Sequence, residues 1–136
     1  MPGPPWVDDP ASVPDEEILW RGVVPESYAP DPLTGKVLPS EGAFRGPGQV
    51  SMYMRRETSV AAMLAKKDTW RLWCLTAKQI REYGCIIVRD VDDDGNTAHV
   101  IVLRADKPGD RLTGGMATKM RRNGYWEDDG PAPAAG

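Results

Sequence analysis

WRLWCLTAKQIREYGCIIVRD, residues 70–90, predicts a strand, a helix and a second strand in direct succession. Residues 70–76 are a short, mostly apolar run, which is typical of a strand buried on both faces in the middle of a sheet. Thr76 and Gln79 match a capping box, in which two side chains satisfy backbone N–H groups at the start of a helix. Gly84 stands where many helices end in the left-handed conformation. We therefore expect a central strand, a capped helix and then the second strand.

The neighbouring segments extend this pattern into an α+β domain. Strands are predicted where β-branched and aromatic residues gather or alternate with polar ones, over residues 18–24, 49–56, 85–91 and 98–104. An Asp-Gly pair between the last two predicts a hairpin. Two more helices are predicted, one capped by Thr58 and one that starts at a cap on Asp110 and ends before Gly124. The expected fold is α+β, a single small domain with a mixed or mainly antiparallel sheet of about five strands and two or three helices.

Proline, glycine and charge divide the 136 residues into an arm, a body and a tail. Residues 1–15 are rich in proline and acidic residues and predict a flexible arm, and residues 127–136 predict a polar tail. The body, residues 16–126, is long enough for one hydrophobic core. Within it, residues 25–48 show neither a helical nor a strand period. We expect a long loop there, and such a loop in a small domain often covers a site.

The overall charge gives no general affinity for polyanions. The chain has 17 Lys and Arg against 20 Asp and Glu, a net charge of −3, so nucleic acid is an unlikely partner. No apolar stretch approaches the roughly 20 residues of a membrane-spanning helix, and the start lacks the regions of a signal peptide. We therefore expect a cytoplasmic protein with no membrane partner.

The residues that bind metals are few. Cys74 and Cys85 each stand in an apolar run, where a free cysteine packs as a small hydrophobe; a disulfide across neighbouring strands is the alternative. With a single histidine, they leave a zinc site short of ligands. DVDDDGN, residues 90–96, matches the first positions of a calcium-binding EF-hand loop, but Ile101 stands where its bidentate glutamate belongs. We expect no metal and no cofactor.

A basic and aromatic cluster lies at the end of the body, in TKMRRNGYW, residues 118–126. Tryptophan, tyrosine and arginine are the residues that most often anchor protein interfaces. The acidic residues that follow the cluster repel a nucleic-acid backbone. We therefore expect a protein partner, contacted by the 25–48 loop and by Trp20, Arg121, Arg122, Tyr125 and Trp126.

His99, the only histidine, stands at the start of a predicted strand. It is a candidate general base at neutral pH. A half-buried histidine with a hydrogen bond at a strand edge is the other interpretation. The sequence shows no partners for a catalytic triad.

Arg21 is the candidate ligand contact on the first predicted strand, in LWRG. A guanidinium at such a position suits a bidentate grip on phosphate. GAFRGPGQVSMY, residues 42–53, then combines glycines that let a backbone approach a ligand with a strand that carries Ser51 and Tyr53 on one face. The ligand-binding candidates here are Arg21, Gly46 and Gly48.

Residues 18–65 resemble the NAD-binding part of ADP-ribosyltransferase-like folds and of the NAD-degrading RES toxins, on the strength of the two motifs above. The resemblance implies that Arg21 holds the phosphates of NAD, that Ser51 orders the pocket and that Tyr53 stacks on the nicotinamide. His99 remains a further catalytic candidate. NAD is then a substrate and not a resident cofactor.

The Glu-x-Glu pair of those transferases has no counterpart in this chain, and the nearest substitute is Asp90-Val-Asp92. Without that carboxylate nothing stabilises an oxocarbenium-like transition state. The whole sequence is also similar to small proteins of actinobacteria or their phages, which carries no catalytic residue over. The preferred hypothesis is a non-catalytic cytoplasmic binding or accessory protein, and the alternative is a small enzyme or toxin that acts on NAD.

Overall fold

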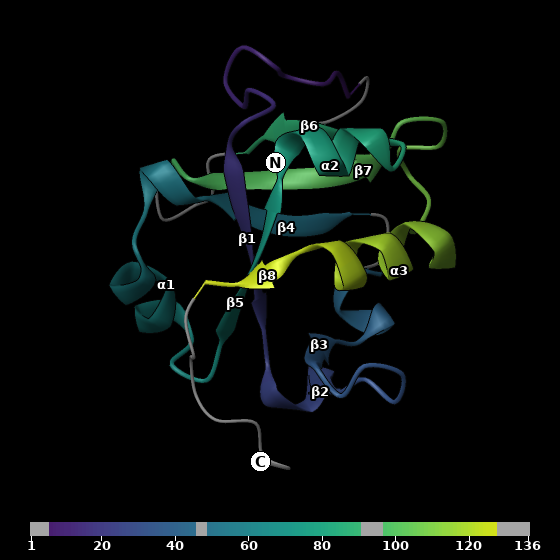
Figure 1. Ribbon diagram of the computed structural model, residues 1–136. Helices are drawn as coiled ribbons and strands as arrows, with labels where there is room; N and C mark the ends of the chain where they lie inside the picture. Colours follow the sequence, from purple (N-terminus) through teal and green to yellow (C-terminus); the bar gives the residue numbers. More distant parts are fainter. Residues whose placement is uncertain (1–5, 46–48, 91–96, 128–136) are drawn as a thin grey trace.

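Residues 6–45, 49–90 and 97–127 are described by the computed structural model, and they form a bent antiparallel sheet with helices on both faces. Figure 1 shows β1 and β5 running steeply across the direction of β4, β7 and β6. The predicted α+β class is confirmed, in its antiparallel form. The strand order is β6 (Cys85–Arg89), β7 (His99–Arg104), β4 (Val50–Met54), β1 (Ile18–Val23), β5 (Arg71–Thr76) and β8 (Tyr125–Trp126).

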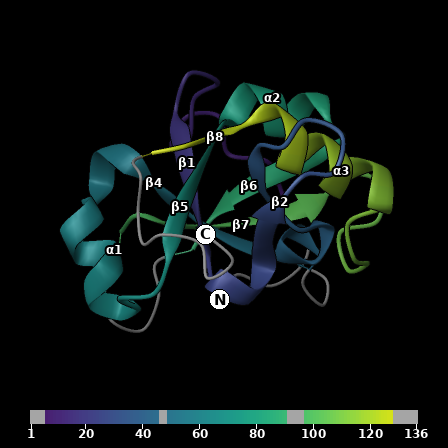
Figure 2. The same cartoon turned by 60° about the horizontal axis from the view of Figure 1, so that its bottom comes forward.

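The two faces of the sheet carry separate hydrophobic clusters. α2 (Ala77–Glu82) and α3 (Gly114–Asn123) lie together over one face, where their buried side chains join the main core (Figure 2). α1 (Val60–Lys66) packs on the other face, where Met63 belongs to the same cluster as Trp20. None of the helices in the described parts of the chain has the length and apolar content to cross a membrane.

The capping box predicted at the start of α2 is confirmed. Thr76 Oγ1 accepts a hydrogen bond from the backbone N–H of Gln79 at 3.1 Å, and Gln79 Oε1 accepts one from the backbone N–H of Thr76 at 2.9 Å. Gly84 follows the helix with φ 95°, the left-handed conformation that favours glycine. The segment therefore leaves β5, turns once over the core and returns as β6.

The other two helices begin later than predicted. The N-cap of α1 is Ser59 and not Thr58, because the hydroxyl of Ser59 accepts from the first turn. The N-cap of α3 is Thr113, whose Oγ1 accepts from the backbone N–H of Met116 at 3.1 Å. The predicted cap Asp110 is wrong, since its own backbone N–H donates within the turn that precedes the helix.

The segment predicted as a long loop contains a short hairpin. Trp126 Nε1 donates to the carbonyl oxygen of Val37 at 2.8 Å, and Arg121 Nε donates to that of Pro39 at 2.8 Å. These bonds tie the hairpin to the C-terminal part of the body. Strands of three residues are too short to show a period, which explains why the sequence did not reveal them. The elements of the segment are η1 (Pro25–Ser27), β2 (Tyr28–Pro30), β3 (Val37–Pro39) and η2 (Glu41–Phe44).

The described part of the predicted N-terminal arm, residues 6–15, lies against α2 and β6. Arg81 of α2 pairs with the carboxylates of Asp8 and Asp15, each at 2.9 Å. Val13 is fully buried in the main core, and the backbone of the segment donates a hydrogen bond to β6. The edge strand is therefore covered on this side.

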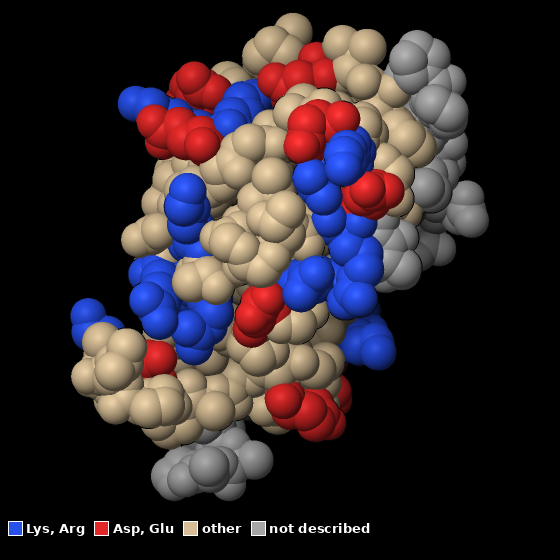
Figure 3. All heavy atoms as spheres, turned by 90° about the vertical axis from the view of Figure 1, so that its right-hand side faces the viewer, with Lys and Arg blue, Asp and Glu red and all other residues tan. Residues whose placement is uncertain are grey.

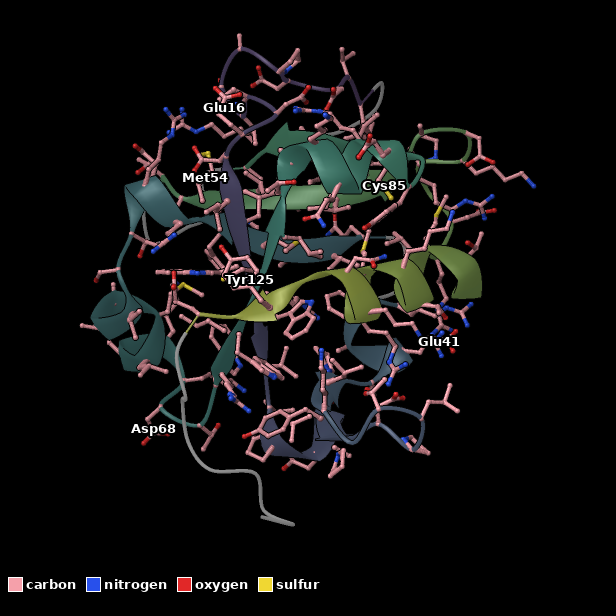
Figure 4. All side chains as sticks on the ribbon, in the orientation of Figure 1. Glu16, Glu41, Met54, Asp68, Cys85 and Tyr125 are labelled. Carbon is pink, nitrogen blue, oxygen red and sulfur yellow. The ribbon has the colours of Figure 1, made fainter. Side chains whose placement is uncertain are left out.

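The two cysteines are free, buried thiols. Cys74 lies on β5 and Cys85 on β6, and three strands of the sheet separate them. The disulfide alternative is therefore wrong. Burial raises the pKa of each thiol to about 12, which makes both unreactive at neutral pH. Figure 4 shows Cys85 beside α2.

Candidate functional site

A cavity of about 550 Å³ opens between the β2–β3 hairpin and the C-terminal strand β8. Its volume is in the range of small-ligand sites. We call it the cationic pocket. Its apolar and aromatic walls are Val37, Leu38, Trp73, Tyr125 and Trp126. Its cations are Lys36, Arg71 and Arg122.

The aromatic wall of the cationic pocket is held in place by hydrogen bonds and ring contacts. Trp126 donates its Nε1 to Val37, and its ring meets Trp73 and Tyr28 edge-on, with centroids 4.8 Å and 5.3 Å away. Trp73 donates its own Nε1 to the carbonyl oxygen of Met120 at 2.8 Å. Because these rings are ordered before anything binds, a ligand loses little free energy in ordering them.

Gly124 allows β8 to approach β5. A Cβ at this position would lie 2.4 Å from the carbonyl oxygen of Cys74 and 2.4 Å from Trp73 Nε1. The predicted role of Gly124 is to stop the last helix. It also brings Trp126 into register opposite Trp73, and so it builds the wall of the pocket.

Positive charge in the cationic pocket is only partly compensated, since Asp31 is the acid near Arg122. The guanidinium carbon of Arg71 lies 4.3 Å from the centroid of the Trp126 ring, and Arg71 Nε is buried without an acceptor in the described parts of the chain. Lys36 and Arg122 also form no ion pair with any described residue. An unsatisfied buried donor costs about 1–3 kcal/mol, so an acceptor that entered the pocket would be favoured.

Asp31 is an acid at the rim of this region. It lines a smaller cavity of about 180 Å³ that shares three residues with the cationic pocket. Its carboxylate accepts from the backbone N–H and the hydroxyl of Thr34, each at 3.1 Å, and lies 3.7 Å from Arg121 Nη2. Burial alone would raise the pKa of Asp31, but these hydrogen bonds together with Arg121 and Arg122 lower it. The carboxylate is thus already satisfied and leaves Arg71 without a partner.

Near the β2–β3 hairpin, positively and negatively charged side chains are mixed on the surface. Figure 3 shows the side of the molecule that lies to the right in Figure 1, where groups of lysine and arginine alternate with aspartate and glutamate. Carboxylates border the groups of cations on this face, and they repel a nucleic-acid backbone.

The predicted partner residues divide between surface and core. Tyr125 is 49 % exposed and lies on β8 in front of the sheet (Figure 4). Arg121 is turned to the hairpin and to Asp31. Trp20 is 2 % exposed and donates its Nε1 to Glu127 at 3.1 Å, so the prediction that it is exposed is wrong. It lies on a strand paired on both sides, beneath α1. The predicted residues that line the cationic pocket are Arg122, Tyr125 and Trp126.

Two cations of the cationic pocket were not predicted individually: Arg71, and Lys36, which lies within the 25–48 loop that was predicted to contact a partner. The signal for Arg71 was present, since it is the only cation in the apolar run of residues 70–76. A charge at the start of a buried strand has to reach a cavity or a counter-ion. Lys36 carried no signal, because the hairpin that presents it had no visible period.

Arg21 lies where β1 and β4 part, and it binds backbone carbonyl groups. Its Nε donates to Ala43 at 2.8 Å and its Nη1 to the carbonyl oxygen of Ser51 at 2.9 Å. Burial lowers the pKa of Arg21, and Tyr53 acts weakly in the other direction. The structure brings Arg21 to the backbone of Ser51 and not to its hydroxyl. Gly46 and Gly48, the glycines predicted to bind a ligand, both lie outside the described residues.

His99 is 9 % exposed and bonded to the end of β6. Its Nδ1 lies 2.7 Å from the carbonyl oxygen of Asp90 and 3.5 Å from Asp90 Oδ2, and its ring packs on Tyr53. This arrangement agrees with a hydrogen-bonded histidine at a strand edge. The described residues contain no group of three or more metal-binding side chains; most of the acidic run, residues 91–96, lies outside them.

Comparison of the chain with family models, with curated proteins and with solved structures finds no match. Its function is therefore argued from its own residues.

Proposed function

We propose that this protein is a non-catalytic, cytoplasmic binding protein that receives an acidic segment of a protein partner in the cationic pocket. The supporting observation is that Lys36, Arg71 and Arg122 converge on one aromatic-lined cavity, while no described residue forms an ion pair with them. A carboxylate of the partner supplies the acceptor that Arg71 Nε lacks.

Arg71 is expected to contribute most of the binding free energy. Its guanidinium stacks on Trp126 and is partly buried, so a hydrogen bond to a carboxylate forms away from bulk water. Hydrogen bonds to charged groups contribute about 1.5–3 kcal/mol. Lys36 and Arg122 are exposed, so each contributes less than about 1 kcal/mol and acts mainly on the association rate.

The surroundings of the pocket favour a short acidic segment over a long polyanion. The chain carries a net charge of −3, and Asp31 lines the smaller cavity that shares three residues with the site. Its carboxylate repels an extended phosphate backbone. Leu38 and the aromatic wall offer apolar area to the side chains that neighbour the acidic residue of a peptide.

The proposal is tested with a fluorescein-labelled glutamate-rich peptide, whose binding is followed by fluorescence anisotropy. The same peptide with glutamine in place of glutamate is the ligand control. Arg71→Met keeps the apolar stem and should weaken binding about tenfold or more. Lys36→Gln and Arg122→Gln should each weaken it by about two- to fivefold. Lys78→Gln, at an exposed position of α2 outside the pocket, is the matched control and should bind like the natural chain.

Two results would contradict the proposal. One is equal affinity for the glutamate and glutamine peptides, or an unchanged affinity in Arg71→Met. The other is cleavage of NAD by the purified protein that disappears in Arg21→Ala, because the alternative hypothesis requires that activity.

A further inference from the structure

Arg21 occupies a gap in the main sheet. β1 pairs with β4 only at Leu19 and Trp20, while it continues to pair with β5 along its whole length. Figure 1 shows β1 crossing β4 at a steep angle, and the pairing between them ends at Trp20. The guanidinium fills the opening, since it donates to Ser51 of β4 and to Ala43 of η2.

The hydrogen bonds to these two carbonyl groups use only some of the N–H donors of the Arg21 guanidinium. An arginine side chain has more N–H donors than the two that these bonds employ, and no described residue accepts from the rest. No carboxylate of the described residues lies within ion-pair distance. Burial lowers the pKa of Arg21, and the interaction with Tyr53 opposes this shift. A partly buried cation without a counter-ion is costly, so an anion that reaches it is held strongly.

A cavity of about 230 Å³ gives access to Arg21. The indole of Trp70 forms one wall and lies on Gly22, where a Cβ would be 2.4 Å from the ring. Gly42 and Ser27 also line the cavity, and the hydroxyl of Ser27 has no hydrogen-bond partner among the described residues. This cavity shares no lining residue with the cationic pocket.

We infer that this cavity binds a phosphate group, either free or carried by a small molecule, with Arg21 as its principal ligand. The side-chain hydrogen-bond donors among the lining residues include the remaining N–H groups of Arg21 and the hydroxyl of Ser27. A tetrahedral phosphate presents acceptors in several directions and so can meet both. The flat indole of Trp70 is available to the group that carries the phosphate.

Loss of stability alone cannot test this inference. The bonds from Arg21 also fasten η2 to the sheet, so any substitution destabilises the fold whether or not an anion binds. The dependence on phosphate separates the two roles, because a purely structural arginine gives no response to the anion.

The experiment measures the melting temperature and the heat of titration with sodium phosphate, against sodium chloride of equal ionic strength. Phosphate should raise the melting temperature of the natural chain. Arg21→Lys keeps the charge and loses the planar fork, and it should weaken phosphate binding about tenfold or more. Lys78→Gln, at an exposed position of α2 outside both cavities, is the matched control and should bind phosphate like the natural chain. Arg71→Met removes the main cation of the cationic pocket and reports any phosphate that is held there. AMP and adenosine distinguish the two sources: tighter binding of AMP than of phosphate, with none of adenosine, assigns a carried phosphate.

A second measurement tests the inference even if Arg21→Lys fails to fold. In the natural chain, the Nε–H resonance of Arg21 should shift on addition of phosphate, and Ser27→Ala should reduce the affinity by about threefold to tenfold. The inference is overturned if phosphate gives no more stabilisation than chloride, or if Arg21→Lys binds it equally. It is also overturned if Arg71→Met abolishes the response, because the anion then sits in the cationic pocket.

Discussion

Replacing Gly124 by alanine should destabilise the protein strongly, because the added methyl group has no space. Its Cβ would lie 2.4 Å from the carbonyl oxygen of Cys74 and 2.4 Å from Trp73 Nε1. Either β8 lifts away from β5, or the indole of Trp73 moves and loses its 2.8 Å bond to Met120. A lost buried hydrogen bond costs about 1–3 kcal/mol and forced repacking a similar amount, so the free energy of unfolding should fall by roughly 2–6 kcal/mol.

Gly22→Ala is the matched control, because the same overlap there is with a movable side chain. The Cβ meets the ring of Trp70, which is partly exposed and can turn toward solvent. The lower entropy of the unfolded chain offsets part of the lost Trp70 contact, so Gly22→Ala should lower the free energy of unfolding by less than Gly124→Ala does. Urea unfolding followed by tryptophan fluorescence measures both variants. The reasoning is refuted if Gly124→Ala falls within about 1 kcal/mol of the natural chain, or if Gly22→Ala costs as much.

Three other features of the fold can be tested separately. Cys74 and Cys85, whose pKa values are raised by burial, should react with iodoacetamide near neutral pH only after unfolding; fast alkylation of the folded protein would show that they are accessible. Thr76→Ala removes the capping box and should lower the free energy of unfolding by about 1 kcal/mol in urea, whereas an unchanged midpoint would contradict its role. The pKa of Asp31 is lowered in the folded state, so its charge stabilises the fold above its ordinary pKa, and this stabilisation is lost as the pH falls through the folded value. In Asp31→Asn the free energy of unfolding should therefore fall less steeply as the pH is lowered. The same dependence on pH as in the natural chain would contradict a lowered pKa for Asp31.

The elements that the sequence predicts well are those specified by neighbouring residues. The segment 70–90 contains a strand period, a capping box and a left-handed glycine, and all three are decided within a few residues of chain. β2, β3 and β8 are different, because strands of two or three residues have no period of their own. They form because the indole of Trp126 reaches Val37, and a contact between such distant residues leaves no local signal.

The candidate site was predictable only in part, for the same reason. Trp126 and Trp20 look alike in sequence, since each follows an apolar or aromatic residue and precedes a charged one, Glu127 or Arg21. Trp126 borders a cavity because β8 ends the sheet, whereas Trp20 is buried because β1 lies between two neighbours and under α1. Arg21 was recognised as a candidate from its place on a strand, but the parting of β1 from β4 that gives it a cavity depends on the bend of the whole sheet.

Both candidate cavities lie where strand pairing stops, and both use the same connecting segment. β3 provides Val37 and Leu38 to the cationic pocket, and η1 and η2 provide Ser27 and Gly42 to the cavity at Arg21. A ligand in either cavity therefore contacts residues 25–44. Binding at the two cavities is coupled if that segment has more than one conformation. Such coupling is reciprocal: phosphate would have to change the affinity for the acidic peptide by the factor by which the peptide changes the affinity for phosphate. If neither ligand changes the affinity for the other, the segment does not couple the two cavities.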